Sequence, residues 1–331
     1  MGQMVKPFRE IHVSELESQS LQEAMDAQGY VLIRDALPVE ELTRLLGEMT
    51  EVLYAAGWLL PGHSPLKRVA DVSKTCGESD EEFKSIYKQI FSMERFHALA
   101  QHGRMREVLS LLVGPRLLVQ PKLVARLIFP NCERLLIDAH QDHQSMAGDP
   151  ESFTAWFPLH DCPEELGPLQ VMEGSHRYGL QSDPVTGYVA RETARGGDWV
   201  GGPIHAGDLL IFHSLTVHAS SSNVSNQMRV SMDFRFQDYA RVLNPALLVF
   251  PGGSANGRSW EATYAGWQSD ALKYYWKRLP LRFSPSTAEL AVLAETADRP
   301  EMRARYARIL TQIEEQMPDQ IPDPIPEQIP N

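Results

Sequence analysis

The chain has 331 residues, of which 43% are hydrophobic and 22% charged, so it can bury the core of a globular protein. Its formal net charge of -12 opposes a phosphate backbone and no local basic cluster offsets it, so the sequence predicts no nucleic-acid partner. The three cysteines, Cys76, Cys132 and Cys162, are widely spaced and odd in number, which disfavours a disulfide framework and predicts a cytoplasmic location.

The N-terminal third of the sequence has mainly helical patterns. Helical spacing from Ser14 to Ala27 leads into the β-prone run Gly29–Ile33. Pro38 then suits the first turn of a further amphipathic helix. Residues 58–82 are irregular, and a connection of that length is typical of a lid or binding loop. Helical patterns resume over residues 81–112.

From Leu117 the pattern changes to short apolar or alternating runs separated by turn signals. This spacing favours an antiparallel sandwich or barrel. The predicted fold class is therefore mainly β, with flanking helices. The predicted strands are Leu117–Gln120, Leu123–Phe129, Phe153–Leu159, Leu169–Met172, Leu209–His213 and Arg229–Phe236.

The domain organisation predicted from these patterns is simple. Residues 1–315 are expected to form a single domain whose β-core covers about 117–240. Helical patterns are predicted again at Trp260–Lys277 and Thr287–Gln316. Residues 316–331 contain a proline repeat that opposes both helix and sheet, which predicts a disordered tail.

The segment Ala139–Gln144 contains the most informative pattern, His140-Gln141-Asp142. On a strand, residues two apart share a face and lie about 6.6 Å apart at the backbone, so His140 and Asp142 could hold one ion. A helix over residues 134–146 is the alternative, and it would place His140 and His143 on one face instead. The pattern therefore needs a third ligand to indicate a metal site.

His218 is the candidate third ligand, because it follows a Gly207-Asp208 turn and a buried apolar strand. Two imidazoles and one carboxylate leave coordination positions open, and this ligand set suits non-haem Fe(II) oxygenases. We therefore predict that His140, Asp142 and His218 are both the metal ligands and the catalytic centre.

A second polar pattern lies on the strand predicted near Arg229. Arg229, Ser231, Asp233 and Arg235 alternate and would share one face. An inward arginine with a serine two positions later suits a bound dicarboxylate, because a guanidinium binds carboxylate with two parallel hydrogen bonds. An exposed strand arginine is the commoner reading of Arg229.

Five segments follow one another in a recognisable order: Gly29–Ile33, His140–Asp142, Gly167–His176, Gly207–Asp208 and His218–Arg229. Together they resemble the phytanoyl-CoA dioxygenase family of Fe(II)- and 2-oxoglutarate-dependent oxygenases, over about residues 29–237. Gly167–His176 is similar to the family's "NGPL…PGSH" segment, although Leu166 and Glu173 replace the usual Asn and Pro.

The resemblance implies a double-stranded β-helix, an eight-stranded jelly-roll related to the cupins, with iron near one open end. It implies that 2-oxoglutarate chelates the iron and that Arg229 pairs with its far carboxylate. Trp156, Ser220 and Ser231 are expected beside this co-substrate. Lys122, Arg126 and His143 are candidates for the substrate pocket.

The activity implied is hydroxylation of a small-molecule or natural-product substrate, using O2 and releasing succinate and CO2. Desaturation, cyclisation or epoxidation on the same scaffold is an alternative. Alternatives from other classes are a cupin-type metal protein that does not use 2-oxoglutarate and a non-catalytic binding module. No apolar run reaches the roughly 20 residues of a membrane span, so no membrane partner is expected, and the chain is expected to be a monomer or homodimer.

Overall fold

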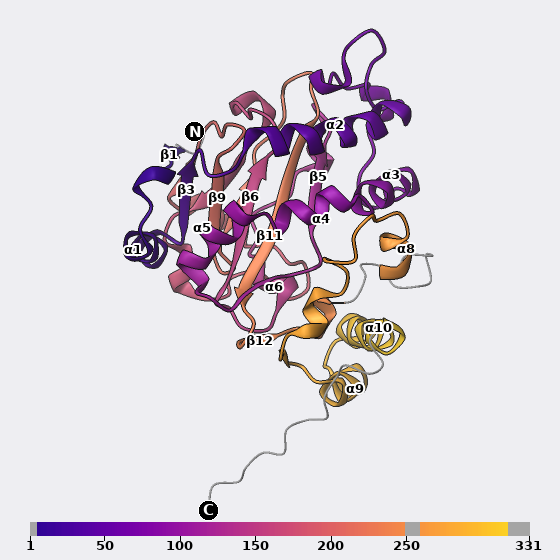
Figure 1. The fold of residues 1–331 in the computed structure, drawn as a ribbon. Helices are drawn as coiled ribbons and strands as arrows, with labels where there is room; N and C mark the ends of the chain where they lie inside the picture. The colour runs from indigo at the N-terminus through magenta and orange to yellow at the C-terminus, as the bar shows by residue number, and fades with distance from the viewer. Residues whose placement is uncertain (1–4, 249–258, 317–331) are drawn as a thin grey trace, which may run out of the picture.

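The computed structural model describes residues 5–248 and 259–316, and within them two β-sheets form the centre of the molecule (Figure 1). The smaller sheet has four strands in the order β1-β8-β7-β10. The larger sheet has seven, in the order β2-β3-β9-β6-β11-β4, with β5 also paired to β11. The strands are β1 (Lys6–Pro7), β2 (Glu10–His12), β3 (Tyr30–Arg34), β4 (Leu117–Val119), β5 (Val124–Ile128), β6 (Ser152–Pro158), β7 (Leu169–Met172), β8 (Trp199–Gly201), β9 (Leu209–His213), β10 (His218–Ser220), β11 (Arg229–Asp238), β12 (Val242–Leu243) and β13 (Arg282–Phe283).

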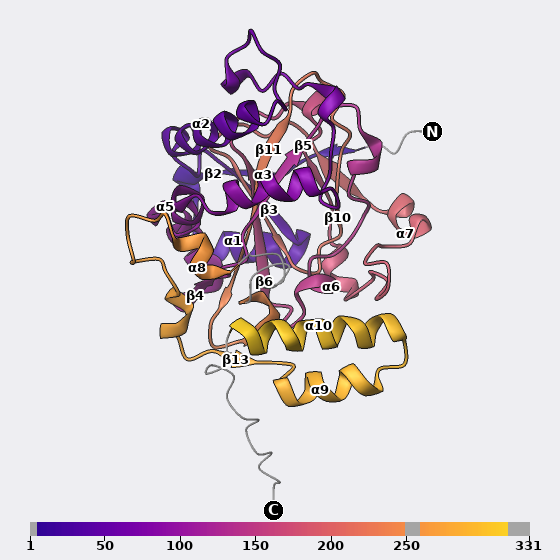
Figure 2. The same cartoon turned by 90° about the vertical axis from the view of Figure 1, so that its right-hand side faces the viewer.

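Helices cover one face of the larger sheet, and a C-terminal pair packs together at one end of the molecule (Figures 1 and 2). None of the helices in the described ranges is long and apolar enough to cross a membrane. The helices are α1 (Ser18–Gln28), α2 (Val39–Ala55), α3 (Glu81–Phe91), α4 (Glu94–Ala100), α5 (Gly103–Val113), α6 (His143–Met146), α7 (Arg191–Gly196), α8 (Trp260–Tyr264), α9 (Thr287–Thr296) and α10 (Pro300–Gln316).

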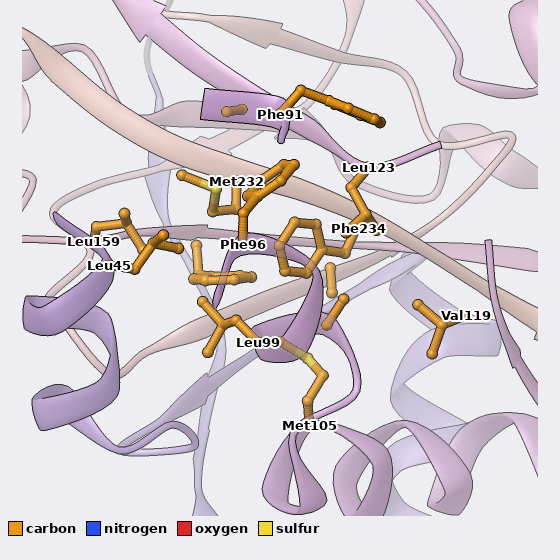
Figure 3. Packing of buried hydrophobic residues seen from close by; sticks show 14 of the residues in the cluster. Leu45, Phe91, Phe96, Leu99, Met105, Val119, Leu123, Leu159, Met232 and Phe234 are labelled. Atoms are coloured by element: carbon orange, nitrogen blue, oxygen red, sulfur yellow. The ribbon is translucent and has the colours of Figure 1, made fainter. Parts of the chain in front are cut away.

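The main hydrophobic core lies between the larger sheet and its helices (Figure 3). Alternate residues of β11, among them Met232 and Phe234, are fully buried there. Phe234 meets Phe96 of α4 edge to face, with ring centroids 5.6 Å apart. Truncating such a buried aromatic side chain to alanine typically costs about 3–5 kcal/mol, so this packing holds β11 firmly in place.

The opposite face of β11 lies toward the smaller sheet. A second apolar cluster joins the two sheets there, through residues such as Tyr30 and Phe212 from the larger and Val171 from the smaller. The polar residues Arg229 and Arg235 belong to this inner face, because they alternate with the residues of the main core. This arrangement confirms the predicted jelly-roll core with flanking helices.

Three predictions about the elements need correction. Residues 260–277 do not form one helix, because only α8 and a short 3-10 turn at Tyr275–Arg278 are regular. His140 and Asp142 do not share a strand, because His140 makes an isolated β-bridge and α6 begins directly after Asp142. The helix proposed as the alternative for 134–146 is also wrong, since α6 covers only its last four residues. The predicted tail lies outside the described residues from 317 onward.

Candidate metal and co-substrate site

His140 and His218 lie directly opposite each other on antiparallel segments. The amide of each donates to the carbonyl oxygen of the other, at 3.0 Å in both directions. Their imidazole centroids are 4.2 Å apart. His218 opens β10 and pairs with Val171 of β7 on its other side. The smaller sheet therefore fixes the position of both imidazoles.

A backbone carbonyl orients each of the two rings. Nδ1 of His140 is 2.9 Å from the carbonyl oxygen of Asp138, and Nδ1 of His218 is 3.0 Å from that of Thr216. Because a carbonyl oxygen can only accept, each Nδ1 carries a proton, and in the neutral form of either ring the lone pair is then on Nε2. This is the tautomer in which a histidine binds a metal through Nε2.

Asp142 completes the group. It takes a helical backbone conformation, with φ -58° and ψ -35°, at the entrance to α6. Its Oδ1 is 4.0 Å from Nε2 of His218, and one ligand atom from each of the three residues lies within 4.8 Å of the others. Two nitrogens and one carboxylate oxygen can hold a divalent cation with coordination positions to spare, so the donors present fit iron.

The carboxylate of Asp142 is held by two neighbours. Arg235 places Nη2 at 3.1 Å from Oδ1, and the Thr154 hydroxyl donates to Oδ2 at 2.5 Å. Burial opposes ionisation of Asp142, but the Arg235 guanidinium, with the two imidazoles, holds the pKa of this carboxyl well below its usual range. Burial lowers the pKa of His140 to about 3, and His218 adds to this effect. At neutral pH, Asp142 is therefore a carboxylate and His140 a neutral imidazole, as metal ligation requires.

Gln141, between the candidate ligands His140 and Asp142, is buried and anchors the segment through its amide group. Its Nε2 donates to the carbonyl oxygens of Gly179 at 2.8 Å and Leu215 at 2.7 Å. Its Oε1 accepts from the amides of Gln181 at 2.6 Å and Ser182 at 2.9 Å. These bonds fix the backbone from which His140 and Asp142 project.

Arg229 is 1% exposed, which excludes the reading of this residue as an exposed strand arginine. Its Nη1 donates to the carbonyl oxygen of Gly167, and its Nη2 is 3.5 Å from the hydroxyl of Ser220. The guanidinium carbon lies 6.0 Å from the ring centroid of Trp156. Nε of Arg229 and the hydroxyl of Ser231 are buried without a hydrogen-bond partner.

No carboxylate of the described residues forms an ion pair with Arg229. Asp233, on the same face of β11, pairs with Arg126 instead, with Nε and Oδ2 2.7 Å apart. Burial lowers the pKa of the Arg229 guanidinium, as expected for a cation without a close counter-ion. Gly167 has φ +71°, and a side chain there would collide with the backbone at Ser221, so glycine permits the close approach of this loop.

Two adjoining cavities open beside the candidate metal ligands. The first, the metal-side cavity, has a volume of about 460 Å³ and is lined by His140, Asp142, Arg126 and Arg235 among others. The second, the Lys122 cavity, has a volume of about 340 Å³ and shares Arg126 and Arg235 with the first. His143 is the first residue of α6, its Nδ1 is buried without a partner, and it is not among the residues that line either cavity.

The sequence did not identify three residues that build this site: Thr154, Arg235 and Gln141. Strand alternation places Arg235 on the face of Arg229, but it gives no partner for either guanidinium. Thr154 and Asp142 are on different elements, so only the folded structure shows their contact.

Two facing sheets of a jelly-roll, with a His-x-Asp pair and a distant histidine at one end, define the class of non-haem Fe(II)- and 2-oxoglutarate-dependent oxygenases. Residues 25–231 match the family model "Phytanoyl-CoA dioxygenase (PhyH)". The chain belongs to the phytanoyl-CoA dioxygenase family, and it is an oxygenase of this class.

Individual relatives agree with this assignment. The chain is 26% identical over 240 residues to a 1-deoxypentalenic acid 11-beta-hydroxylase of Streptomyces exfoliatus, covering 67% of this chain and 81% of that protein. The corresponding enzyme of Streptomyces arenae is 25% identical over the same length. Among solved structures, EctD from S. alaskensis with bound Fe aligns with a TM-score of 0.50 at 16% identity, covering 73% of this chain and 86% of that one. That likeness supports the fold.

Proposed function

We propose that the protein hydroxylates a small-molecule substrate of natural-product type, consuming 2-oxoglutarate and O2 and releasing succinate and CO2. His140, Asp142 and His218 would hold the iron, and Arg229 would anchor 2-oxoglutarate. The bound iron would supply the oxidising chemistry needed to break an unactivated C–H bond. The relatives named as 1-deoxypentalenic acid 11-beta-hydroxylases support both the reaction type and a small-molecule substrate.

The buried guanidinium of Arg229 is the observation that carries the proposal. An arginine that is 1% exposed and has no acidic partner in the described chain calls for an anionic ligand. The far carboxylate of 2-oxoglutarate would accept two parallel hydrogen bonds from it. The unpartnered hydroxyl of Ser231 and the hydroxyl of Ser220 would donate to the same group.

The protein's own residues would contribute positioning and a dry environment. Arg235 and Thr154 hold Asp142 in one orientation, and backbone carbonyls orient the two imidazoles. Trp156 is 1% exposed and closes the inner face beside Arg229. The metal-side cavity would admit the substrate next to the ligands. Such preorganisation keeps water from a reactive centre.

Calorimetric titration of 2-oxoglutarate into protein loaded with Fe(II) under anaerobic conditions tests the proposal. Arg229→Ala is expected to weaken 2-oxoglutarate binding by about 30-fold to several thousand-fold, because truncating one partner of a buried charge pair costs about 2–5 kcal/mol. Arg229→Lys should recover only part of this, since an ammonium cannot make the two-pronged contact.

Arg116→Ala is the matched control, because Arg116 pairs with Asp238 at the far end of β11 and is mostly exposed. It should leave 2-oxoglutarate binding unchanged. An Arg229→Ala protein with the wild-type affinity for 2-oxoglutarate would contradict the assignment of the co-substrate site. Absence of succinate formation across a panel of small carboxylic acids that includes 1-deoxypentalenic acid would contradict the proposed reaction.

A further inference from the structure

The Lys122 cavity is lined by both apolar side chains and cations. About half of its lining residues are apolar or aromatic, and its charged residues are four cations and one acid, Glu78. It adjoins the metal-side cavity, and the residues that line both are Glu78, Phe83, Arg126, Ser145 and Arg235. A molecule in the Lys122 cavity could therefore reach the metal ligands. The apolar residues that line it are Phe83, Leu123, Val124, Met146 and Leu247, with Tyr87 beside them.

Some cations of this cavity form ion pairs with acidic side chains, and Lys122 does not. Arg126 pairs with Asp233 at 2.7 Å and with Glu78 at 2.9 Å. Arg235 pairs with Asp142 at 3.1 Å. Lys122 has no ion pair and no hydrogen bond with any residue in 5–248 or 259–316, although it is largely covered by its neighbours. It is the ammonium that this cavity leaves without a protein partner.

The surroundings of Lys122 add further positive charge. Burial lowers the pKa of its ammonium, and the guanidinium groups of Arg235 and Arg305 add to that effect. Arg305 lies on α10, and it too has no ion pair within the described parts of the chain. Helix α10 lies across the end of the molecule, beside α9 (Figure 2). Arg305 does not line the cavity, but it is close enough to affect Lys122. Of the four cations that do line the cavity, Lys84, Arg126 and Arg235 have acidic partners, and Lys122 has none among the described residues.

We propose that this cavity binds a carboxylate of the substrate, so that the substrate is a compact apolar molecule carrying a carboxylic acid. Lys122 pairs with the carboxylate, and the aromatic and aliphatic walls cover the hydrocarbon body. The boundary that the two cavities share lets the body of the molecule extend from Lys122 toward His140 and Asp142. This inference deepens the proposed function and depends on it.

The size and chemistry of the cavity favour a carboxylate over a phosphate ester. A phosphate brings nearly two charges and three strong acceptor oxygens. Within a volume of about 340 Å³, Lys122 is the one lining cation that has no acidic partner among the described residues. One such cation beside apolar side chains suits a ligand that has a single carboxylate and a hydrocarbon body.

The test compares two ligands of the same shape, adamantane-1-carboxylate and adamantane-1-carboxamide, by calorimetry on protein loaded with Mn(II) and saturating 2-oxoglutarate. The acid should bind wild-type protein at least about tenfold more tightly than the amide, the equivalent of roughly 1.4 kcal/mol. Lys122→Met should abolish this preference, whereas Lys122→Arg should keep it. Lys74→Met, which removes an exposed lysine outside the cavity, should leave it unchanged.

Equal binding of acid and amide, binding of neither, or a preference that survives Lys122→Met would overturn the inference. Tighter binding of adamantyl phosphate than of the acid would overturn the choice of carboxylate. The same titrations on Arg229→Ala separate this inference from the proposed function, because Arg229 does not line the cavity. If Arg229→Ala loses 2-oxoglutarate binding but still prefers the acid to the amide, the result supports the role of Lys122 independently of the co-substrate site.

Discussion

Arg235 donates to both carboxylate oxygens of Asp142, with Nη2 3.1 Å from Oδ1 and Nε 3.4 Å from Oδ2. Both side chains are buried, so each is the other's main counter-ion in the protein without a metal. A bound dication would place a second positive group against the same carboxylate. The arginine therefore stabilises Asp142 in the metal-free protein, and a bound metal would share this carboxylate with it.

Arg235→Met should destabilise the metal-free protein by about 3–5 kcal/mol, because it leaves the buried Asp142 carboxylate without its guanidinium counter-ion. The free energy of unfolding of the metal-loaded protein should fall by less, since the ion replaces the missing positive charge. Thermal unfolding with and without Mn(II) would show this as a larger metal-induced rise in Tm for the variant than for the wild type. Arg116→Met should not change that rise, and an equal rise in Arg235→Met would contradict this account.

Replacing any one of His140, Asp142 and His218 by alanine should nearly abolish binding of Fe(II) or Mn(II). The loss should exceed the roughly 10- to 100-fold effect that removing a supporting residue causes. Equilibrium dialysis with metal analysis measures it. His143→Gln, adjacent to Asp142 but outside the group, is the control. Full metal occupancy in any of the three alanine variants would remove that residue from the ligand set.

Gln141→Leu tests a residue that supports the site without binding the metal. The substitution leaves two carbonyl oxygens and two backbone amides without their partners. Metal affinity should fall by roughly 10- to 100-fold, and the free energy of unfolding should fall by at least about 1–3 kcal/mol. Gln141→Glu keeps the acceptor oxygen and should recover part of the stability. Unchanged metal affinity in Gln141→Leu would contradict the anchoring role.

His97 should make the protein less stable in mild acid. It is buried among aromatic rings on α4, with Nε2 2.7 Å from the carbonyl oxygen of Phe91, and burial lowers its pKa from 6.5 to about 4. Between these values the unfolded chain binds the extra proton, so stability falls as the pH falls from about 6.5 toward 4. The contribution of this residue is roughly 3 kcal/mol.

Denaturant unfolding of wild type and His97→Gln from pH 7 to pH 4 would measure this effect. Glutamine keeps a donor for Phe91 but does not titrate, so the variant should lose about 3 kcal/mol less over this range. His63→Gln, which removes an exposed imidazole, should follow the wild type. Parallel pH profiles for wild type and His97→Gln would contradict the prediction.

Local patterns predicted most of the β-core correctly. Leu209–His213 and Leu169–Met172 are strands with the predicted bounds, because an apolar run between turn signals has few other ways to bury itself. The helical pattern at Thr287–Gln316 was right in type but is divided before Pro300, where proline suits a first helical turn. The helix predicted over 260–277 failed because its aromatic residues pack as a cluster, with Trp260 and Trp276 centroids 4.9 Å apart.

The candidate site was predictable in its residue types but not in its contacts. His140, Asp142 and His218 could be chosen from their chemistry and order. Their convergence was expected from strand alternation, which is wrong, since Asp142 turns toward the histidines through a helical backbone conformation. Its contact with Arg235 depends on the register between β11 and β6, where Arg235 lies opposite Thr154. Sequence patterns do not give that register.

The mutual backbone pairing of His140 and His218 ties together two segments that lie far apart along the chain. An ion held by both side chains would cross-link those segments, since neither could leave the other without releasing the metal. A metal at 100 times its Kd stabilises the state in which the two segments are paired by about 2.7 kcal/mol. Amide hydrogens of these two residues would then exchange with solvent about 100-fold more slowly when the ion is bound, which makes them local reporters of occupancy that need no substrate and no turnover.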